Sequence, residues 1–187
     1  MHARLRQHVA LKARQRILLI GWDFDTRIHL ERGRRWWQRP WKRGYPVRLG
    51  SFIAWLARHR TELDIRILKW SFGVLTMPLR ATMLWDLARW ARHSRITFRF
   101  DTAHPVGCSH HQKIAIFDGK VAVCGGIDTT DKRWDTREHR EHDDRRKTPN
   151  GRRYGPWHDA TMMMEGEVAA ALEELGADRW ICAGGTA

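Results

Sequence analysis

Short apolar segments alternate with longer amphipathic ones over the first hundred residues. A buried apolar run at residues 16–22 predicts a strand, residues 64–70 predict another, and the alternating pattern at 95–100 predicts a third. Residues 5–15, 49–60 and 77–93 carry apolar side chains at helical intervals, which predicts three helices. Because helices and strands alternate, we expect an α/β fold with a mixed, largely parallel sheet flanked by helices.

The second half of the chain predicts a hairpin, a polar loop, a strand and a helix. Apolar runs at residues 113–117 and 121–124 flank Asp118-Gly119, a pair that tolerates the positive φ of a tight turn. The polar stretch 138–153 is expected to be an exposed loop. A strand at 160–164 and a helix at 167–180 follow. A chain of 187 residues can bury its own core, so we expect a single domain over residues 1–187.

The charge is strongly basic, with 34 Lys and Arg against 21 Asp and Glu and a formal net charge of +13. Such an excess predicts attraction to nucleic acid, an anionic membrane surface or a phosphate-bearing substrate. Much of it lies at residues 27–48, where Trp36, Trp37 and Trp41 are interleaved with Lys and Arg. These residue types suit a lipid headgroup layer. A solvated basic loop whose tryptophans pack on the domain is a slightly better interpretation.

Cysteine content and hydropathy narrow the class of protein further. The three cysteines are far apart and form no C-x-x-C pair, so neither a disulfide framework nor a zinc knuckle is expected. The chain has no apolar run of the roughly 18–20 residues that span a bilayer. We expect a cytoplasmic or peripheral membrane protein without a signal peptide.

His111 and Lys113 form the most informative pair of residues in the chain. If they lie on a strand, residues two apart project from the same face. Lysine offers a point charge to phosphate oxygens, and histidine offers a nitrogen nucleophile at neutral pH. An isolated H-x-K pair is more often a strand-start histidine beside a solvated lysine, so the surrounding spacing decides.

That spacing resembles the signature of the phospholipase D superfamily, H-x-K-x4-D-x6-G-[S/G]-x-[N/D]. His111, Lys113, Asp118 and the segment GGID at residues 125–128 occupy its positions. The chain also resembles phospholipase D-like lipid enzymes in further segments, and the resemblance runs from about residue 5 to 180. These segments are GWDFD at 21–25, SHHQK at 109–113, RWDT at 133–136 and PWHD at 156–159.

The resemblance implies phosphodiester cleavage through a phosphohistidine on His111, with Lys113 neutralising the phosphoryl oxygens. It places Asp128 near the phosphate and implies that Asp159 hydrogen-bonds the His111 imidazole, as the carboxylate does in a serine-protease triad. Asp118 completes the catalytic motif, although its position in the hairpin turn favours a structural role. The candidate catalytic residues are therefore His111, Lys113, Asp118 and Asp159.

This chemistry requires no cofactor and no metal. The segment HREHDD at residues 139–144 combines histidine with carboxylates, but arginines surround it and oppose cation binding. We interpret it as a solvated loop. His104 and His110 are expected to line the site rather than bind metal.

Lipid-cleaving members of the superfamily carry two motifs that meet in one site, whereas this chain has one. The second motif could come from a missing C-terminal half, which the flanking segments favour, or from a homodimer partner. A monomer should turn over poorly or not at all. The leading hypothesis is a phosphodiesterase or phosphatidyltransferase that cleaves glycerophospholipid headgroups. The alternatives are a homodimeric metal-independent nuclease and an inactive anion-binding half-domain.

Overall fold

The computed structural model describes residues 2–30, 44–70, 81–105 and 107–186. Its centre is a six-stranded sheet of order β3-β2-β1-β4-β5-β6. The strands are β1 (Arg16–Gly21), β2 (Asp64–Trp70), β3 (Ile96–Asp101), β4 (Ile114–Phe117), β5 (Val121–Gly125) and β6 (Thr161–Glu165). The helices are α1 (His2–Ala10), α2 (Leu49–His59), α3 (Ala81–Trp90) and α4 (Glu167–Cys182).

The sheet is mixed, which confirms the predicted fold class. β1 pairs with β2 and β2 with β3 in parallel, and α2 and α3 connect these strands. The pairs β1–β4, β4–β5 and β5–β6 are antiparallel. Parallel pairing is therefore confined to β1, β2 and β3, the strands that the helix–strand alternation predicted. The β4–β5 hairpin and β6 form the antiparallel half of the sheet.

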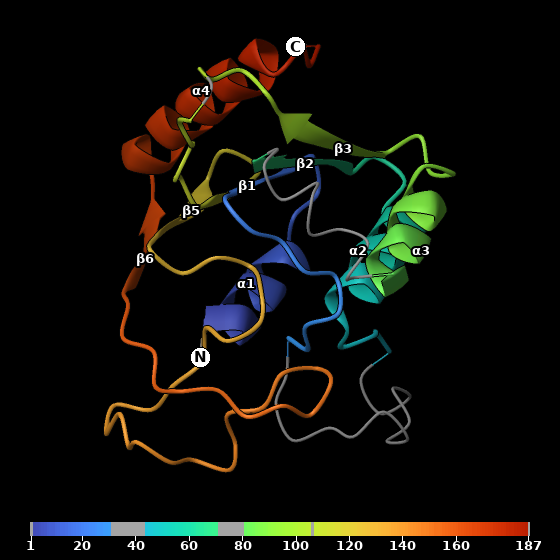
Figure 1. Ribbon diagram of the computed structural model, residues 1–187. Helices are drawn as coiled ribbons and strands as arrows, with labels where there is room; N and C mark the ends of the chain where they lie inside the picture. Colours follow the sequence, from blue (N-terminus) through green and yellow to red (C-terminus); the bar gives the residue numbers. More distant parts are fainter. Residues whose placement is uncertain (1, 31–43, 71–80, 106, 187) are drawn as a thin grey trace.

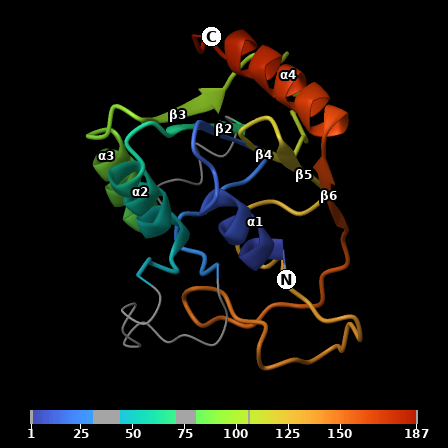
Figure 2. The same cartoon turned by 180° about the vertical axis from the view of Figure 1, so that it is seen from behind.

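Helices cover both faces of the sheet. α1, α2 and α3 lie on one face and α4 lies on the other (Figures 1 and 2). Side chains alternate between these layers along each strand, so Ile17 packs toward α1–α3 whereas Leu18 packs toward α4. In β4, Phe117 packs toward α1–α3 and Ile116 packs toward α4. Burial on both faces explains why the sequence shows continuous apolar runs at these strands.

The first helix is shorter than the sequence predicts. It ends at Ala10, whereas helical spacing suggested residue 15. The backbone N–H groups of Arg14, Gln15 and Arg16 donate instead to the carboxylate of Asp118, at 2.9, 2.8 and 2.9 Å. These bonds replace helical bonds and direct the chain into β1.

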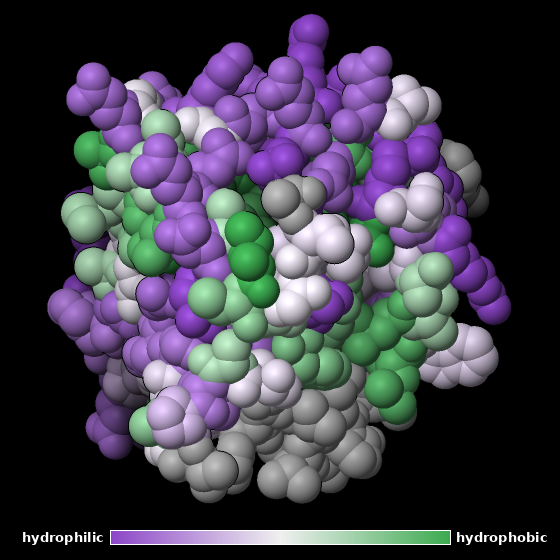
Figure 3. Space-filling model, turned by 90° about the horizontal axis from the view of Figure 1, so that it is seen from above, coloured by the Kyte–Doolittle hydropathy of each residue, from purple (hydrophilic) through white to green (hydrophobic). Residues whose placement is uncertain are grey.

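The surface is predominantly polar on the side that carries α4. Hydrophilic side chains dominate this view, and apolar ones gather in small patches (Figure 3). Exposed Met162, Val168 and Ile181 lie on β6 and α4. Among the helices that the structure describes, none is both long and apolar enough to cross a bilayer. Trp36, Trp37 and Trp41 of the basic segment lie outside the described residues.

Candidate active site

The motif residues gather at one edge of the sheet. The carboxyl ends of β1, β2 and β5 reach this edge, and β4 and β6 begin there, because each antiparallel neighbour reverses the chain. Ile114 pairs with Cys124, and Gly125 pairs with Thr161. The segments just before β4, just after β5 and just before β6 are therefore neighbours, although up to 50 positions separate residues 111 and 161 in the sequence.

Lys113 and Asp128 form a buried ion pair at this edge. The Nζ atom lies 3.1 Å from Oδ2 of Asp128, and the exposed fractions of the two side chains are 4% and 1%. Oδ1 of Asp128 accepts the backbone N–H groups of Trp22 and Asp23 at 3.0 and 3.1 Å. Both carboxylate oxygens are thus bound to protein groups. Asp128, which the sequence placed beside the phosphate, positions Lys113 and the end of β1.

A second buried pair lies one strand away. Nζ of Lys69, at the end of β2, is 3.1 Å from Oδ1 of Asp23, and its side chain is only 2% exposed. Oδ2 of Asp23 accepts the hydroxyl of Thr130 at 2.7 Å. Since the N–H of Asp23 also bonds Asp128, the two ion pairs are joined through the end of β1. The edge therefore holds two ammonium groups in fixed positions.

One aromatic ring contacts the predicted nucleophile, and further rings extend from it. His111 is exposed, and its ring meets the edge of Trp22 at a centroid distance of 5.7 Å. Trp22 stacks on Trp70 at 5.5 Å, and Nε1 of Trp70 donates to Nε2 of His104 at 3.0 Å. The His104 and His110 rings are 5.6 Å apart. These rings leave His111 open to solvent on the same side of the molecule as the Lys113–Asp128 pair.

The predicted placement of His111 and Lys113 on a strand is wrong. Both lie in the segment without regular secondary structure before β4, which begins at Ile114. The Lys113 side chain folds inward to Asp128, and its Nζ also donates to the carbonyl of His111 at 3.3 Å. The two groups are held together by this bond and by Trp22, whose ring centroid is 5.9 Å from Nζ, rather than by strand alternation.

Asp118 lies at the opposite edge of the sheet from Lys113. The four residues of β4 separate them, a span of roughly 17 Å at the usual rise of a strand. Its carboxylate accepts the three N–H groups before β1, and its φ of 54° suits the hairpin turn. Burial raises the pKa of Asp118, but the bonds from Arg16, Arg14 and Gln15 hold it below the ordinary value. These contacts favour the structural role that the hairpin turn suggested for Asp118, away from Lys113.

The predicted hydrogen bond between Asp159 and His111 is absent from the described part of the chain. Oδ1 of Asp159 instead accepts the N–H of Ala160 at 2.8 Å, as β6 begins. The carboxylate rests on Gly126, where an added Cβ would lie 2.5 Å from Cγ of Asp159. Since β5 separates the strands that follow Asp159 and His111, the acid reaches the glycine pair of the motif and not the ring.

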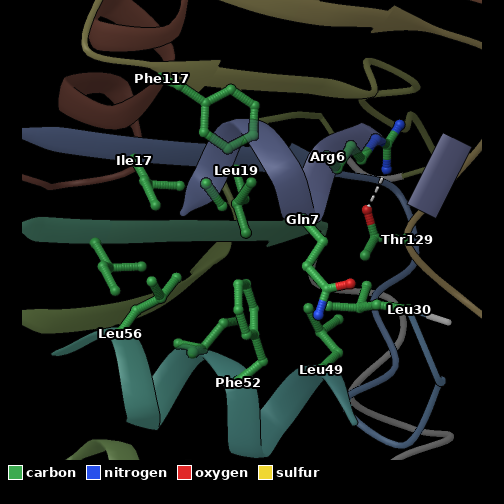
Figure 4. A pocket seen from close by; sticks show the side chains of 13 residues that line it. Arg6, Gln7, Ile17, Leu19, Leu30, Leu49, Phe52, Leu56, Phe117 and Thr129 are labelled. Carbon is green, nitrogen blue, oxygen red and sulfur yellow. Dashed lines mark hydrogen bonds between the residues drawn. The ribbon is translucent and has the colours of Figure 1, made fainter. Parts of the chain in front are cut away.

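Arg6 supports the motif loop from the opposite side. Its guanidinium donates to the Thr129 hydroxyl at 2.6 Å and to the Ile127 carbonyl at 3.1 Å, on either side of Asp128. Burial lowers the pKa of Arg6, and the charge of Asp128 opposes that shift. Beside it, α1, α2 and the sheet enclose an apolar cavity of about 40 Å³ (Figure 4). The lining of this cavity belongs to the core, and the half-buried Arg6 stabilises the loop on either side of Asp128.

Comparison with known proteins identifies the fold. No protein-family model matches the chain. Its sequence is 24% identical to Phospholipase D B of Dictyostelium discoideum over 197 residues, which cover 90% of this chain and 15% of that protein. Its structure is similar to Nuc from Salmonella typhimurium, described as a phospholipase D family member, with a TM-score of 0.52 and 15% identity over 95% of this chain and 85% of Nuc. The chain has the phospholipase D fold.

The structure is also similar to a protein of another kind. TrmBL2, an archaeal chromatin protein described as binding DNA in a novel mode, is similar with a TM-score of 0.50 and 14% identity. The match covers 96% of this chain and 48% of TrmBL2. The chain spans about 15% of the length of its curated relative. The fold alone therefore leaves the substrate open.

One cluster in this phospholipase D fold was missed by the sequence interpretation. The segment 139–144 was expected to be a solvated loop, yet the His139 ring bonds Asp135 at 2.9 Å and His158 at 3.0 Å. The spacing D-x3-H at Asp135 and His139 was the available signal, but nothing in it indicates His158. Among the described residues, no group of three or more His, Cys, Asp or Glu side chains could hold a metal ion.

Proposed function

We propose that this chain contributes a phospholipase D-type phosphodiesterase site. A ring nitrogen of His111 attacks phosphorus, the bond to the leaving alcohol breaks, and water then hydrolyses the phosphohistidine. The observation that carries the proposal is the bond that joins the backbone of an exposed histidine to a buried ammonium. His111 is open to solvent, and its carbonyl accepts a bond from Nζ of Lys113.

The Lys113–Asp128 pair supports a role in stabilising the transition state. Asp128 and Trp22 fix the ammonium before substrate arrives, so the protein does not have to reorganise as charge develops on the phosphoryl oxygens. The negative charge of Asp128 lies on the buried side of Lys113. An incoming phosphoryl group therefore meets the ammonium on the side nearer His111.

Glycerophospholipid is the first substrate class that we propose. The similarity to Phospholipase D B over 90% of this chain supports it, and a net charge of +13 suits an anionic membrane surface. Hydrolysis of the headgroup bond and transfer to another alcohol share the same phosphohistidine.

Nucleic acid is the second substrate class. The same net charge attracts a phosphate backbone, and TrmBL2, which has a similar fold, is described as binding DNA. Cleavage of nucleic acid should weaken steeply with added salt, because bound counterions are released when basic side chains neutralise phosphates.

A second motif is part of the proposal. It would come either from a C-terminal half or from another copy of this chain across a two-fold axis. In the second case the specific activity of the purified chain should rise with protein concentration, and sedimentation should show a dimer over the same range.

The test compares substrates and variants in the presence of EDTA. Purified chain is incubated with phosphatidylcholine vesicles and, separately, with a labelled oligonucleotide. We expect turnover of one of them that His111→Asn removes and His142→Asn keeps, since His142 is exposed in the loop away from β4. Turnover that survives His111→Asn, or no turnover of either substrate by a chain that sedimentation shows to be a dimer, would contradict the proposal.

A further inference from the structure

Two large apolar side chains project into solvent from the middle of α3. Trp85 is 79% exposed and Leu84 is 48% exposed. Ala88, which follows them by one helical turn and therefore lies on the same side of α3, is exposed as well. The outward side of a surface helix is normally polar, so this strip of Leu84, Trp85 and Ala88 departs from the usual pattern. We call it the α3 strip.

The other side of α3 makes the contacts that hold the helix on the domain. Met83 and Trp90 are buried in the core, and Nε1 of Trp90 donates to the carbonyl of Gly50 at 3.0 Å. Asp86 is buried too, and its carboxylate accepts the two Nη atoms of Arg48 at 3.0 and 2.6 Å. The helix is therefore anchored without the α3 strip, which can contact another molecule while the fold stays intact.

The two helices α2 and α3 are strongly basic. Residues 49–60 and 81–95 contain one acid, Asp86, and five arginines, which are Arg58, Arg60, Arg89, Arg92 and Arg95. The single acid is buried and paired with Arg48 and Arg89. Of the five arginines, Arg58, Arg60 and Arg92 are exposed. The charged side chains that reach solvent from these two segments are therefore all positive.

Arg92 continues the line of the α3 strip. It lies seven positions after Trp85, which is two helical turns and about 10 Å along the axis. Its backbone N–H donates to the carbonyl of Arg89 at 3.3 Å, so the turn persists beyond the last residue of α3. One side of this helix thus carries apolar side chains first and a cationic one next.

Further arginines converge on the same end of α3. Nη2 of Arg95 donates to the carbonyl of Ala57 at 2.6 Å, which joins the carboxyl ends of α2 and α3. Burial lowers the pKa of His93, which lies between Arg92 and Arg95 in the sequence. The positive charges of Arg58, Arg95 and Arg89 lower this pKa further. The arginines of both helices therefore produce one positive region beside the α3 strip.

An anionic membrane surface fits this combination of side chains. Tryptophan and leucine enter the boundary between headgroups and acyl chains, and nearby arginines attract anionic headgroups. Nucleic acid would attract the same arginines but offers no apolar layer for Leu84. A stable protein interface takes roughly 20–30 residues a side, and two large apolar side chains are too few for its core.

We infer that the α3 strip and the arginines beside it bind an anionic membrane surface, with Trp85 and Leu84 inserted among the headgroups. The inference deepens the proposed function, on whose lipid substrate class it rests, because it names the surface by which the chain reaches a membrane. Binding at this surface requires no turnover, so it is measured separately from the chemistry of His111.

The opposite face of the sheet supplies a matched control. Met162 on β6 is 64% exposed, and α4, which follows β6, lies on the other side of the sheet from α3 (Figures 1 and 2). The exposed charged side chains of β6 and α4 are acids, which are Glu165, Glu167, Glu174 and Asp178. An anionic membrane repels such a surface, so Met162 is an exposed apolar residue that should not insert.

Sedimentation of the full chain with sucrose-loaded vesicles measures the binding. We expect binding to mixed vesicles of phosphatidylcholine and phosphatidylglycerol that weakens with added salt, and much weaker binding to phosphatidylcholine alone. Trp85→Ser should weaken binding to the mixed vesicles about tenfold, whereas Met162→Ser should not. Arg92→Gln should weaken it about fivefold, whereas Lys120→Gln, which removes one charge from the β4–β5 turn, should have little effect.

Thermal melts that match those of the parent chain show that these surface variants are folded. Equal binding by Trp85→Ser and the parent, equal losses in Trp85→Ser and Met162→Ser, or no binding of the parent to the mixed vesicles would overturn the inference. Tighter binding to a labelled oligonucleotide, lost in Arg92→Gln but kept in Trp85→Ser, would identify a nucleic-acid surface and overturn it as well. His111→Asn should bind vesicles like the parent, so a failure of this surface is distinguishable from a failure of the proposed chemistry.

Discussion

Nζ of Lys113 lies 3.1 Å from a carboxylate oxygen of Asp128 in a site where both side chains are almost completely buried. A buried charge is costly unless it is paired, so each residue depends on the other. The same carboxylate bonds the N–H groups of Trp22 and Asp23. This single acid therefore connects the motif lysine to the end of β1.

Asp128→Ala should lower the free energy of unfolding by about 3–5 kcal/mol, because it leaves an unpaired buried ammonium. Adding Lys113→Met should recover part of this loss, since the uncompensated charge is then gone. Urea denaturation of the two variants measures both effects. Asp178→Ala, on the exposed side of α4, should change stability by less than about 0.5 kcal/mol. If the Asp128→Ala chain were as stable as this control, the two buried charges would not depend on each other.

Asp118→Asn should reduce stability in a pH-dependent way. The carboxylate accepts three N–H groups, and its pKa is below the ordinary value. A depressed folded-state pKa contributes stability that is complete above the unfolded pKa of about 4 and is lost as the pH falls through the folded value. We expect wild type to exceed the variant by about 1–3 kcal/mol at pH 7.

That difference should shrink below about pH 4, because the carboxyl protonates first in the unfolded chain and, at lower pH, in the folded one. Asparagine accepts hydrogen bonds at all these pH values and tolerates the positive φ of the turn. Urea titrations at pH 7, 5 and 3.5 provide the measurement. A difference that is constant over this range would show that the charge of Asp118 does not matter.

The two motif glycines should respond differently to alanine. A Cβ at residue 125 would lie 2.7 Å from the Cα of Thr161, so the β5–β6 pairing would have to shift. A Cβ at residue 126 would instead meet the exposed Asp159 carboxylate, which can swing away. We expect Gly125→Ala to cost several-fold more unfolding free energy than Gly126→Ala, whose cost should be about 1 kcal/mol. Thermal melts of the two variants compare them directly, and equal losses would argue against this packing.

The strands could be predicted from the sequence because their burial is regular. The predicted span of β2, residues 64–70, agrees with the structure, since Ile65, Ile67 and Leu68 are buried between the helical layers. The end of α1 could not be predicted, because it depends on Asp118, about a hundred positions away. Local periodicity carries no information about such a bond.

The same limit applies to the site. The spacing of His111, Lys113 and Asp128 pointed to one location, and the sheet brings these residues to one edge. Their contacts differed from expectation because Lys113 turns inward to Asp128 and Asp159 caps Ala160. The bond between His139 and His158 joins residues 19 positions apart in irregular structure. No periodic pattern predicts such a contact.

The central claim is that His111 becomes covalently bonded to phosphorus. The direct measurement is intact-protein and peptide mass spectrometry after the chain is mixed with phosphatidyl-p-nitrophenol and quenched within milliseconds to seconds under alkaline conditions, which preserve phosphohistidine. We expect one phosphatidyl adduct on the peptide that contains His111, and none in His111→Asn. An adduct on another residue, or burst release of p-nitrophenol with no adduct at His111, would contradict the account.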